Sequence, residues 1–328
     1  MKNKLLLVFT TAFAVVTFNA CDILHPDVPG QLVPLTVDED LSLPSITVNG
    51  TKLHSEAFGN PNDPMIVVLH GGPGGDYRYL LKSTTFSNDG FYVVFYDQRG
   101  SGLSRRHPRE SYTTVQLFID DLDSVISHYR RSPGQKVILV GQSWGAMLAT
   151  AYVNEHPDKV SGLILSEPGG FTWHDAKAFV NRCMQMNLFN EAANDFMYLD
   201  HIITGNDHIM LDYKAALKSA ESFAAGNKMG YSGPVPFWRL GAVCSSVCVS
   251  MAEKDPFDFT TNLSAYTGKV LFLYSELDKA YGKAYAEHVS SSFPNVQLVE
   301  IKGSGHVILY FGWDNFYPVA KTYLDTIK

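Results

Sequence analysis

The feature that most constrains the fold of this chain is a five-residue turn between an apolar strand and a helix. Residues 141–145 read Gly-Gln-Ser-Trp-Gly, directly after the apolar run 137–140 and directly before the small-residue stretch 146–151. In a Gly-x-Ser-x-Gly turn, the glycines permit a strained backbone that holds the serine hydroxyl clear of the sheet edge. The pattern therefore predicts that Ser143 is a nucleophile, and that strands and helices alternate around it.

An activated serine also needs backbone donors that stabilise an oxyanion. The apolar strand 65–69 runs into the loop His70-Gly-Gly-Pro-Gly, whose flexible backbone can approach such a charge. We expect the amides of Gly72 and Trp144 to be the two donors. His70 is a rival for the catalytic base, but in this loop we expect it to brace the backbone.

The base and the acid are expected after two late apolar strands. Residues 270–274 lead to Asp278, and residues 296–301 lead to the glycine-flanked His306. In the corresponding mechanism, the histidine takes the serine proton and the acid orients the imidazolium. The chain order Ser143, Asp278, His306, with each group after a strand, predicts an α/β-hydrolase fold: a mostly parallel twisted sheet flanked by helices.

The identity of the acid is less constrained than the other two roles. Glu276 lies two residues before Asp278, and Glu167 follows another apolar strand, 162–166. We expect Asp278 to be the acid. Glu167 is the next candidate, because an acid at the end of its strand can also reach the histidine.

Three motifs together resemble the proline iminopeptidase group of α/β-hydrolases. They are residues 70–74 (His-Gly-Gly-Pro-Gly), 97–104 (Asp-Gln-Arg-Gly-Ser-Gly-Leu-Ser) and 141–145. The resemblance implies a serine exopeptidase that releases an N-terminal residue, often proline, from short peptides. It also admits a relative that acts on other small amides or esters, so a carboxylesterase remains the alternative enzyme.

The resemblance covers a core of residues 45–169 and 268–328 and places a helical cap at residues 170–267. Three segments of this cap carry apolar residues at helical spacing, and a Gly/Pro-rich stretch is a candidate hinge or lid connection. The helical segments are residues 174–180, 190–199 and 211–220, and the candidate hinge is residues 230–236.

Aminopeptidases of the group hold the substrate's ammonium with cap glutamates, in motifs that are not intact here. A buried ammonium still needs a carboxylate partner, and Glu167 is the candidate. Otherwise Glu167 braces the loop beneath the cap. Phe171 and Trp238 either line an apolar substrate pocket or pack the cap.

The N-terminus predicts export. Two lysines precede the apolar run 5–18, which is shorter than the ~20 residues of a transmembrane helix. The run ends in Phe-Asn-Ala-Cys, which resembles a bacterial lipoprotein cleavage site. We therefore expect a signal peptide over residues 1–20, lipid on Cys21, and an irregular tether over residues 21–44. The protein would then be anchored on the periplasmic or cell-surface side; an ordinary secretory signal is the alternative.

Composition narrows the remaining classes. The formal charge is −7 and no basic stripe is present, which argues against nucleic-acid partners. The cysteines lack zinc-site spacing and residues 71–75 lack the ending of a phosphate-binding loop, so no metal or other cofactor is expected. The sequence leaves open a disulfide bridge from Cys183 to either Cys244 or Cys248. A non-catalytic binding lipoprotein is the alternative from another functional class, and the oligomeric state is not predicted.

Overall fold

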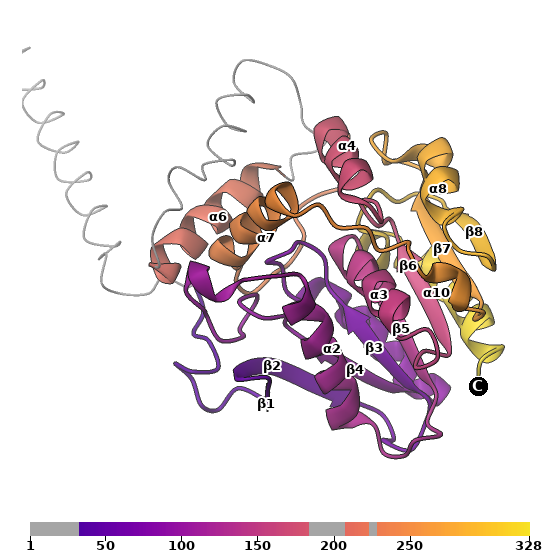
Figure 1. The fold of residues 1–328 in the computed structure, drawn as a ribbon, viewed down its shortest axis with the longest axis horizontal. Helices are drawn as coiled ribbons and strands as arrows, with labels where there is room; N and C mark the ends of the chain where they lie inside the picture. Colours follow the sequence, from indigo (N-terminus) through magenta and orange to yellow (C-terminus); the bar gives the residue numbers. More distant parts are fainter. Residues whose placement is uncertain (1–32, 184–206, 223–227) are drawn as a thin grey trace, which may run out of the picture.

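The computed structural model describes residues 33–183, 207–222 and 228–328, and its centre is an eight-stranded sheet (Figure 1). The strand order is β1-β2-β4-β3-β5-β6-β7-β8. The first two strands pair antiparallel and the other six run parallel, which confirms the predicted mostly parallel sheet. The strands are β1 (Ser45–Val48), β2 (Thr51–Phe58), β3 (Met65–Leu69), β4 (Tyr92–Tyr96), β5 (Val137–Gln142), β6 (Gly162–Ser166), β7 (Val270–Ser275) and β8 (Val296–Ile301).

Helical segments cover both faces of the sheet. The alternation of side chains along β3 shows the division: Val67 belongs to one apolar cluster and Val68 to the other. The first cluster includes residues of α2 (Gln116–Tyr129), α3 (Trp144–Glu155) and α8 (Gly282–Ser290). The second includes residues of η1 (Arg78–Asp89), α9 (Ile308–Phe311) and α10 (Trp313–Asp325).

Helices inserted between β6 and β7 lie at one end of the sheet (Figure 1). They include α4 (Trp173–Cys183), α6 (His208–Ser222) and α7 (Ala242–Lys254), and α6 packs against α7. The helices predicted over residues 174–180 and 211–220 are thus confirmed. The helix predicted over residues 190–199 lies outside the described residues. Cys183, Cys244 and Cys248 are free thiols, so no bridge joins them.

The C-terminal helix carries a proline in its interior. Helix α10 begins at Trp313 and places Pro318 in its interior, where the ring removes one backbone hydrogen bond. The aromatic rings of Trp313 and Phe316 pack with Phe86 of η1, with ring centroids of 5.8 and 6.3 Å. This aromatic packing offsets the local cost of the proline.

The segment before the sheet packs against the core. Among residues 33–44, none belongs to a strand or helix, yet Val37 is fully buried. Its amide donates to the carbonyl of Leu103 over 2.8 Å, and its carbonyl accepts from Lys52 Nζ over 2.6 Å. The predicted signal peptide and Cys21 lie outside the described residues. In the part of the chain that is described, no helix has the length and apolar character needed to cross a membrane.

Candidate active site

The turn between β5 and α3 has the strained geometry that its sequence predicts. Ser143 adopts φ 55° and ψ −120°, an unusual conformation for a residue other than glycine. A side chain at Gly141 would collide with the carbonyl of Gly145, and one at Gly145 would collide with the carbonyl of Leu69. The glycines are therefore required because α3 begins so close to β3 and β5.

The glycine-rich loop after β3 lies directly against this turn. A Cβ atom built on Gly71 would lie 3.1 Å from Cβ of Ser143. Gly72 has φ 128°, a conformation that disfavours any residue with a side chain. Trp144 is the first residue of α3, so its amide has no acceptor within the helix. Both expected oxyanion donors thus belong to segments that meet at the serine.

His306 follows β8 and is directed by its backbone and its ring. Its amide donates to the carbonyl of Met229 over 2.8 Å. Its Nδ1 atom lies 2.9 Å from Oε2 of Glu167 and 3.4 Å from Oδ2 of Asp278. Because Nδ1 faces carboxylates, Nε2 is the ring nitrogen left for a reacting group.

Both carboxylates are buried and follow adjacent strands, Glu167 after β6 and Asp278 after β7. Each accepts hydrogen bonds from backbone amides. Oε1 of Glu167 accepts hydrogen bonds from the amide and hydroxyl of Ser275, at 2.6 and 2.7 Å. Oδ1 of Asp278 accepts from the amides of Ala280 and Tyr281, at 2.8 and 3.0 Å. The oxygens of Glu167 are therefore occupied by β7 and by the histidine, and the residue belongs to the histidine's support.

The charges of these groups change their proton affinities. Burial alone lowers the pKa of His306, but the hydrogen bonds and charges of Asp278 and Glu167 outweigh it and raise the pKa to about 9. Burial also raises the pKa of Glu167, although the hydrogen bond and charge of His306 oppose this. The pKa of His306 therefore lies well above the ordinary histidine value of ~6.5.

Glu167, Asp278 and His306 also have the residue types of a metal site. Their candidate ligand atoms lie within 4.8 Å of one another. Both oxygens of Glu167 are already hydrogen-bonded, to β7 and to the imidazole, and Oδ1 of Asp278 accepts from two amides. The geometry is that of a histidine supported by carboxylates.

A chain of hydrogen bonds that the sequence did not reveal joins the loops around Ser143. The Tyr79 hydroxyl accepts from the amide of Gly71 and donates to Oε1 of Gln142, each over 2.7 Å. Nε2 of Gln142 donates to the carbonyl of His306 over 3.1 Å. Gln142 stands inside the recognised motif, but nothing in the sequence indicated that Tyr79 would reach it.

His70 braces the glycine-rich loop, as expected. Its Nδ1 lies 2.8 Å from the carbonyl of Gly71, and its Nε2 accepts from the amide of Gln98 over 2.9 Å. Burial lowers its pKa, which favours the neutral ring that this pattern requires. The Gln98 side chain donates to the carbonyl of His70 and accepts from Nε1 of Trp144, so this loop and α3 are linked.

The two aromatic candidates for substrate binding lie in different surroundings. Phe171 is 1% exposed and packs its ring against Phe272 and Phe293, within the hydrophobic core. Trp238 is partly buried, with its ring edge-on to Tyr77 at 5.0 Å. Its amide donates to Oδ2 of Asp76 over 2.6 Å. Phe171 thus lies in the core beside β7, and Trp238 lies where the cap meets the loop after β3.

Gly230, the first residue of the predicted hinge, and the two residues before it are packed between the acid and histidine loops. The carbonyl of Lys228 accepts from the amide of Lys279 over 2.7 Å, and Met229 accepts from His306 as described above. A side chain at Gly230 would come within 2.6 Å of the Leu277 carbonyl. Residues 228–230 therefore contact both loops that carry the candidate acid and base.

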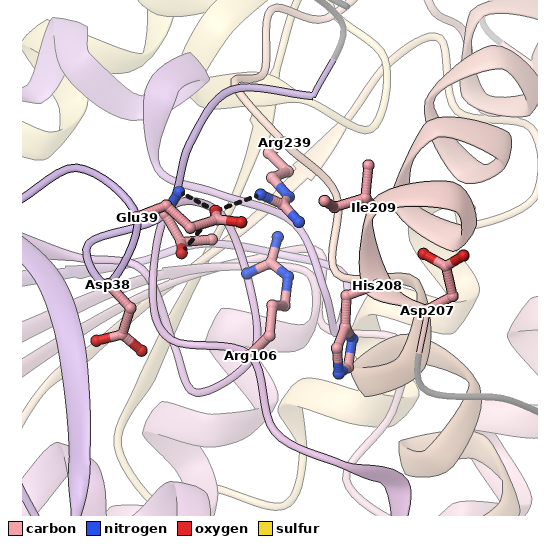
Figure 2. Close-up of a pocket in the computed structure, with 8 residues that line it drawn as sticks. Asp38, Glu39, Arg106, Asp207, His208, Ile209 and Arg239 are labelled. Atoms are coloured by element: carbon pink, nitrogen blue, oxygen red, sulfur yellow. Dashed lines mark hydrogen bonds and ion pairs between the residues drawn. The ribbon is translucent and has the colours of Figure 1, made fainter. Parts of the chain in front are cut away.

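A separate cavity of about 350 Å³ lies between the N-terminal segment and the cap (Figure 2). Arg106 and Arg239 both contact Oδ2 of Asp212, at 2.9 and 2.8 Å, and Nη1 of Arg239 also lies 3.2 Å from Oε2 of Glu39. None of its lining residues belongs to the candidate catalytic set. They are Thr36, Asp38, Glu39, Arg106, Asp207, His208, Ile209 and Arg239.

Comparison with known proteins identifies the family. The model of the alpha/beta hydrolase fold family matches residues 64–312. This chain is an α/β-hydrolase. It belongs to the proline iminopeptidase-like group, because it is 32% identical over 269 residues to the proline iminopeptidase PfmaB of Pestalotiopsis fici, spanning 80% of this chain and 92% of that protein.

Other relatives agree with this grouping. A proline iminopeptidase of Saccharolobus solfataricus is 24% identical over 84% of this chain and 88% of its own length. A match to the Arabidopsis thaliana proline iminopeptidase is 37% identical but spans only 34% of this chain and 29% of that protein.

Solved structures show the same fold at low sequence identity. The proline iminopeptidase of Mycobacterium smegmatis has a TM-score of 0.57 at 19% identity, covering 86% of this chain and 97% of its own. A structure from the thaumarchaeon Nitrososphaera gargenis, from work on carboxylesterases, has a TM-score of 0.62 at 15% identity, covering 87% and 98%. This α/β-hydrolase thus shares its fold with proteins named for amide and for ester chemistry.

Proposed function

We propose that this α/β-hydrolase is a serine hydrolase in which Ser143 is the nucleophile and His306 the base. The observation that carries the proposal is the meeting of the strained serine turn, the glycine-rich loop and the carboxylate-supported imidazole at one edge of the sheet. Gln142 connects these parts, since its side chain bonds to Tyr79 and to the backbone of His306.

In the proposed mechanism, His306 Nε2 takes the proton of Ser143 as its oxygen attacks an acyl carbon. The carboxylates hold the Nδ1–H and stabilise the imidazolium. The amides of Gly72 and Trp144 stabilise the oxyanion. The imidazolium then returns its proton to the leaving group, and water releases the acyl group from the serine by the same route. The chemistry needs no metal or other cofactor.

The substrate that we propose is a short peptide with a free N-terminus, from which the enzyme releases the first residue. Support comes from the relatives of known name, among which proline iminopeptidases from several kingdoms recur. The proline preference of those relatives is the natural first test for this chain.

A carboxylesterase acting on small esters is the second candidate, and one observation favours it. Glu167, the residue expected to bind a substrate ammonium, has both oxygens engaged with Ser275 and His306. An aminopeptidase therefore needs another carboxylate for the ammonium, whereas an esterase needs none.

The deciding experiment compares the purified chain with Ser143→Ala on proline and alanine arylamides, their N-acetylated forms and a short-chain aryl ester. We expect Ser143-dependent cleavage of free but not acetylated arylamides. Equal turnover of the free and acetylated arylamides would reject the aminopeptidase assignment. Turnover of the ester alone would reject it too. Absence of turnover on every substrate would favour a non-catalytic binding lipoprotein.

We further propose that the protein is exported and anchored to a bacterial membrane through lipid on Cys21. Support comes from the two lysines, the apolar run 5–18 and the Phe-Asn-Ala-Cys ending. Mass spectrometry of the mature N-terminus tests this: a lipid-modified Cys21 is expected, and an unmodified terminus elsewhere would contradict it.

A further inference from the structure

We propose that His306 is oriented by two carboxylates, so that Glu167 is a positioning residue for the reaction in addition to Asp278. In the resting arrangement Glu167 receives the Nδ1–H, and Asp278 is the second acceptor at the same atom. This inference rests on the proposed function, and it adds to the Ser-Asp-His set a residue that reaches the reacting atoms only through the imidazole.

The first argument is geometric. An N–H forms its stronger hydrogen bond with the nearer acceptor, and Nδ1 of His306 is closer to Glu167 Oε2, at 2.9 Å, than to Asp278 Oδ2, at 3.4 Å. Oδ2 of Asp278 is buried and has no hydrogen-bond donor in the described structure. A buried acceptor without a donor is costly. Its place beside the imidazole is explained if it accepts the proton when the ring moves away from Glu167.

The second argument is the way Glu167 is held. It directly follows β6, and its amide donates to the carbonyl of Leu273 on β7 over 3.1 Å. Its φ of 42° is a strained conformation for a glutamate. Strain of this kind persists only where surrounding contacts fix it, and Ser275 supplies two of them. The result is one carboxylate oxygen clamped to the sheet and the other directed at His306.

The third argument is charge. Two carboxylates face one imidazole, and burial together with the negative charge of Asp278 favours the protonated form of Glu167, while His306 opposes it. Tyr231, Tyr281 and Cys183 also lie around the cluster, and burial raises the pKa of each of them, so they are neutral near pH 7. Arg182 and Lys228 add positive charge nearby that acts on Cys183, while Glu167 and Asp278 are the groups that face the His306 ring itself.

The structure offers matched variants for a test. In Glu167→Gln, the amide oxygen can keep the bonds from Ser275 while the NH₂ group replaces the oxygen facing His306. Asp278→Asn does the same, because its oxygen can keep the amides of Ala280 and Tyr281. The control is Glu276→Gln, the same chemical change at an exposed carboxylate that bonds to Lys302 and to the backbone of Gly303.

We expect each single variant, made in the full chain, to lose about 10-fold in kcat/KM on the best substrate, because the other carboxylate takes over. The double variant should lose about 10⁴-fold, the loss typical of an unsupported catalytic histidine, which exceeds the product of the single losses. The rise of activity with pH should begin at lower pH in each single variant. Glu276→Gln should match the wild-type chain in both respects.

Glu167 is only a brace for β7 if Glu167→Gln leaves both the rate and the pH profile unchanged, even where it lowers the melting temperature. A loss of about 10⁴-fold in one single variant, with the other close to wild type, would also overturn the sharing of the proton. Circular dichroism and thermal melting identify any variant that fails to fold. If Glu167→Gln fails to fold, the titration of His306 is measured by NMR in Glu167→Asp instead. We expect that variant to shift the His306 pKa, and an unchanged titration would overturn the proposal.

A failure of the proposed function remains distinguishable. If no substrate shows Ser143-dependent turnover, NMR titration of the His306 ring still measures whether each carboxylate influences it. A lower His306 pKa in both single variants supports the two-carboxylate arrangement without reference to activity. A pKa that responds to only one of the two contradicts it.

Discussion

Two clusters of charged side chains in this molecule are balanced in different ways. At the end of β6 and β7, two carboxylates surround one imidazole, whose charge depends on a single proton. Between the N-terminal segment and the cap, Arg106 and Arg239 face Asp212, and Arg239 also faces Glu39. In the second cluster the two guanidinium charges are permanent and are balanced by two carboxylates.

The difference indicates what each cluster is for. In the second cluster, which we call the arginine cluster, both guanidinium groups also donate to backbone carbonyls. Arg106 donates to the carbonyls of Gly102 and Ser104, and Arg239 donates to that of Pro34. Its guanidinium groups link Pro34 and Glu39 of the N-terminal segment to Asp212 of the cap. The histidine cluster has an excess of acid and a proton that can leave, which suits a catalytic base.

The largest effect should come from removing the hydroxyl of Ser143, the proposed nucleophile, while leaving both clusters intact. We expect Ser143→Ala to lower kcat by about 10⁶-fold, the scale of a missing nucleophile. Its thermal unfolding should match the wild type, since the variant loses one hydroxyl. Turnover near the wild-type rate would show that the histidine cluster does not serve Ser143.

Breaking the arginine cluster should affect stability, not chemistry. Asp212→Asn leaves the buried guanidinium of Arg239 and the partly buried one of Arg106 without their shared carboxylate, although the amide oxygen can still accept from Ala242. We expect a loss of about 3–5 kcal/mol in the free energy of unfolding. Urea titration measures it, and kcat of the folded fraction should be unchanged. A loss below about 1 kcal/mol would mean that the cluster contributes little to folding.

The pH dependence of activity should follow the protonation of His306. Since His306 must be neutral to act as a base and its pKa is raised to about 9, activity should rise with pH through about 9. Turnover at pH 7 should then be about 1% of its alkaline limit. A rate constant that is flat between pH 7 and 10 would contradict this, provided that a substrate isotope effect shows chemistry to be rate-limiting.

The same raised pKa has a consequence for stability. Because folding favours the protonated ring, the stabilisation from His306 is fully present below its unfolded pKa of ~6.5 and is lost as the pH rises through about 9. Unfolding free energies at pH 6 and pH 10 in the wild type and in His306→Gln measure it. The difference between the two proteins should shrink with rising pH, and a difference that grows would reverse the sign.

The smallest effect is expected at the rim of the arginine cluster. The side chain of Glu39 is 36% exposed, so water screens its ion pair with Arg239. We expect Glu39→Gln to cost at most about 1 kcal/mol in unfolding free energy and to leave kcat unchanged. A cost equal to that of Asp212→Asn would show that the N-terminal segment is held as tightly as the buried pair.

The sequence predicted the fold because local patterns carried it. The apolar strands and the intervening helical segments define a parallel sheet, and the glycines around Ser143 have contacts that exclude any side chain. Two long-range features escaped prediction. Glu167 and Asp278 are 111 positions apart in the chain and share one imidazole only because β6 pairs with β7. The bond from Tyr79 to Gln142 likewise depends on packing that no motif records.

The raised pKa of His306 is a third feature that no sequence pattern indicates. That shift depends on how deeply His306 is buried and on how many carboxylates reach it, and both are properties of the assembled site. The role of Glu167 changed for the same reason. From the sequence, the Glu167 carboxylate is a candidate to bind an ammonium group. In the folded chain both of its oxygens are already hydrogen-bonded.

The most direct test of the proposed site is covalent labelling with an aryl phosphonate ester that mimics the tetrahedral acyl intermediate, followed by peptide mass spectrometry. We predict one adduct on Ser143 in the wild-type chain, slower labelling in the Glu167→Gln/Asp278→Asn double variant, and no adduct in Ser143→Ala. An adduct on another residue, or hydrolytic activity that persists with Ser143 unlabelled, would contradict the assignment of Ser143 as the nucleophile.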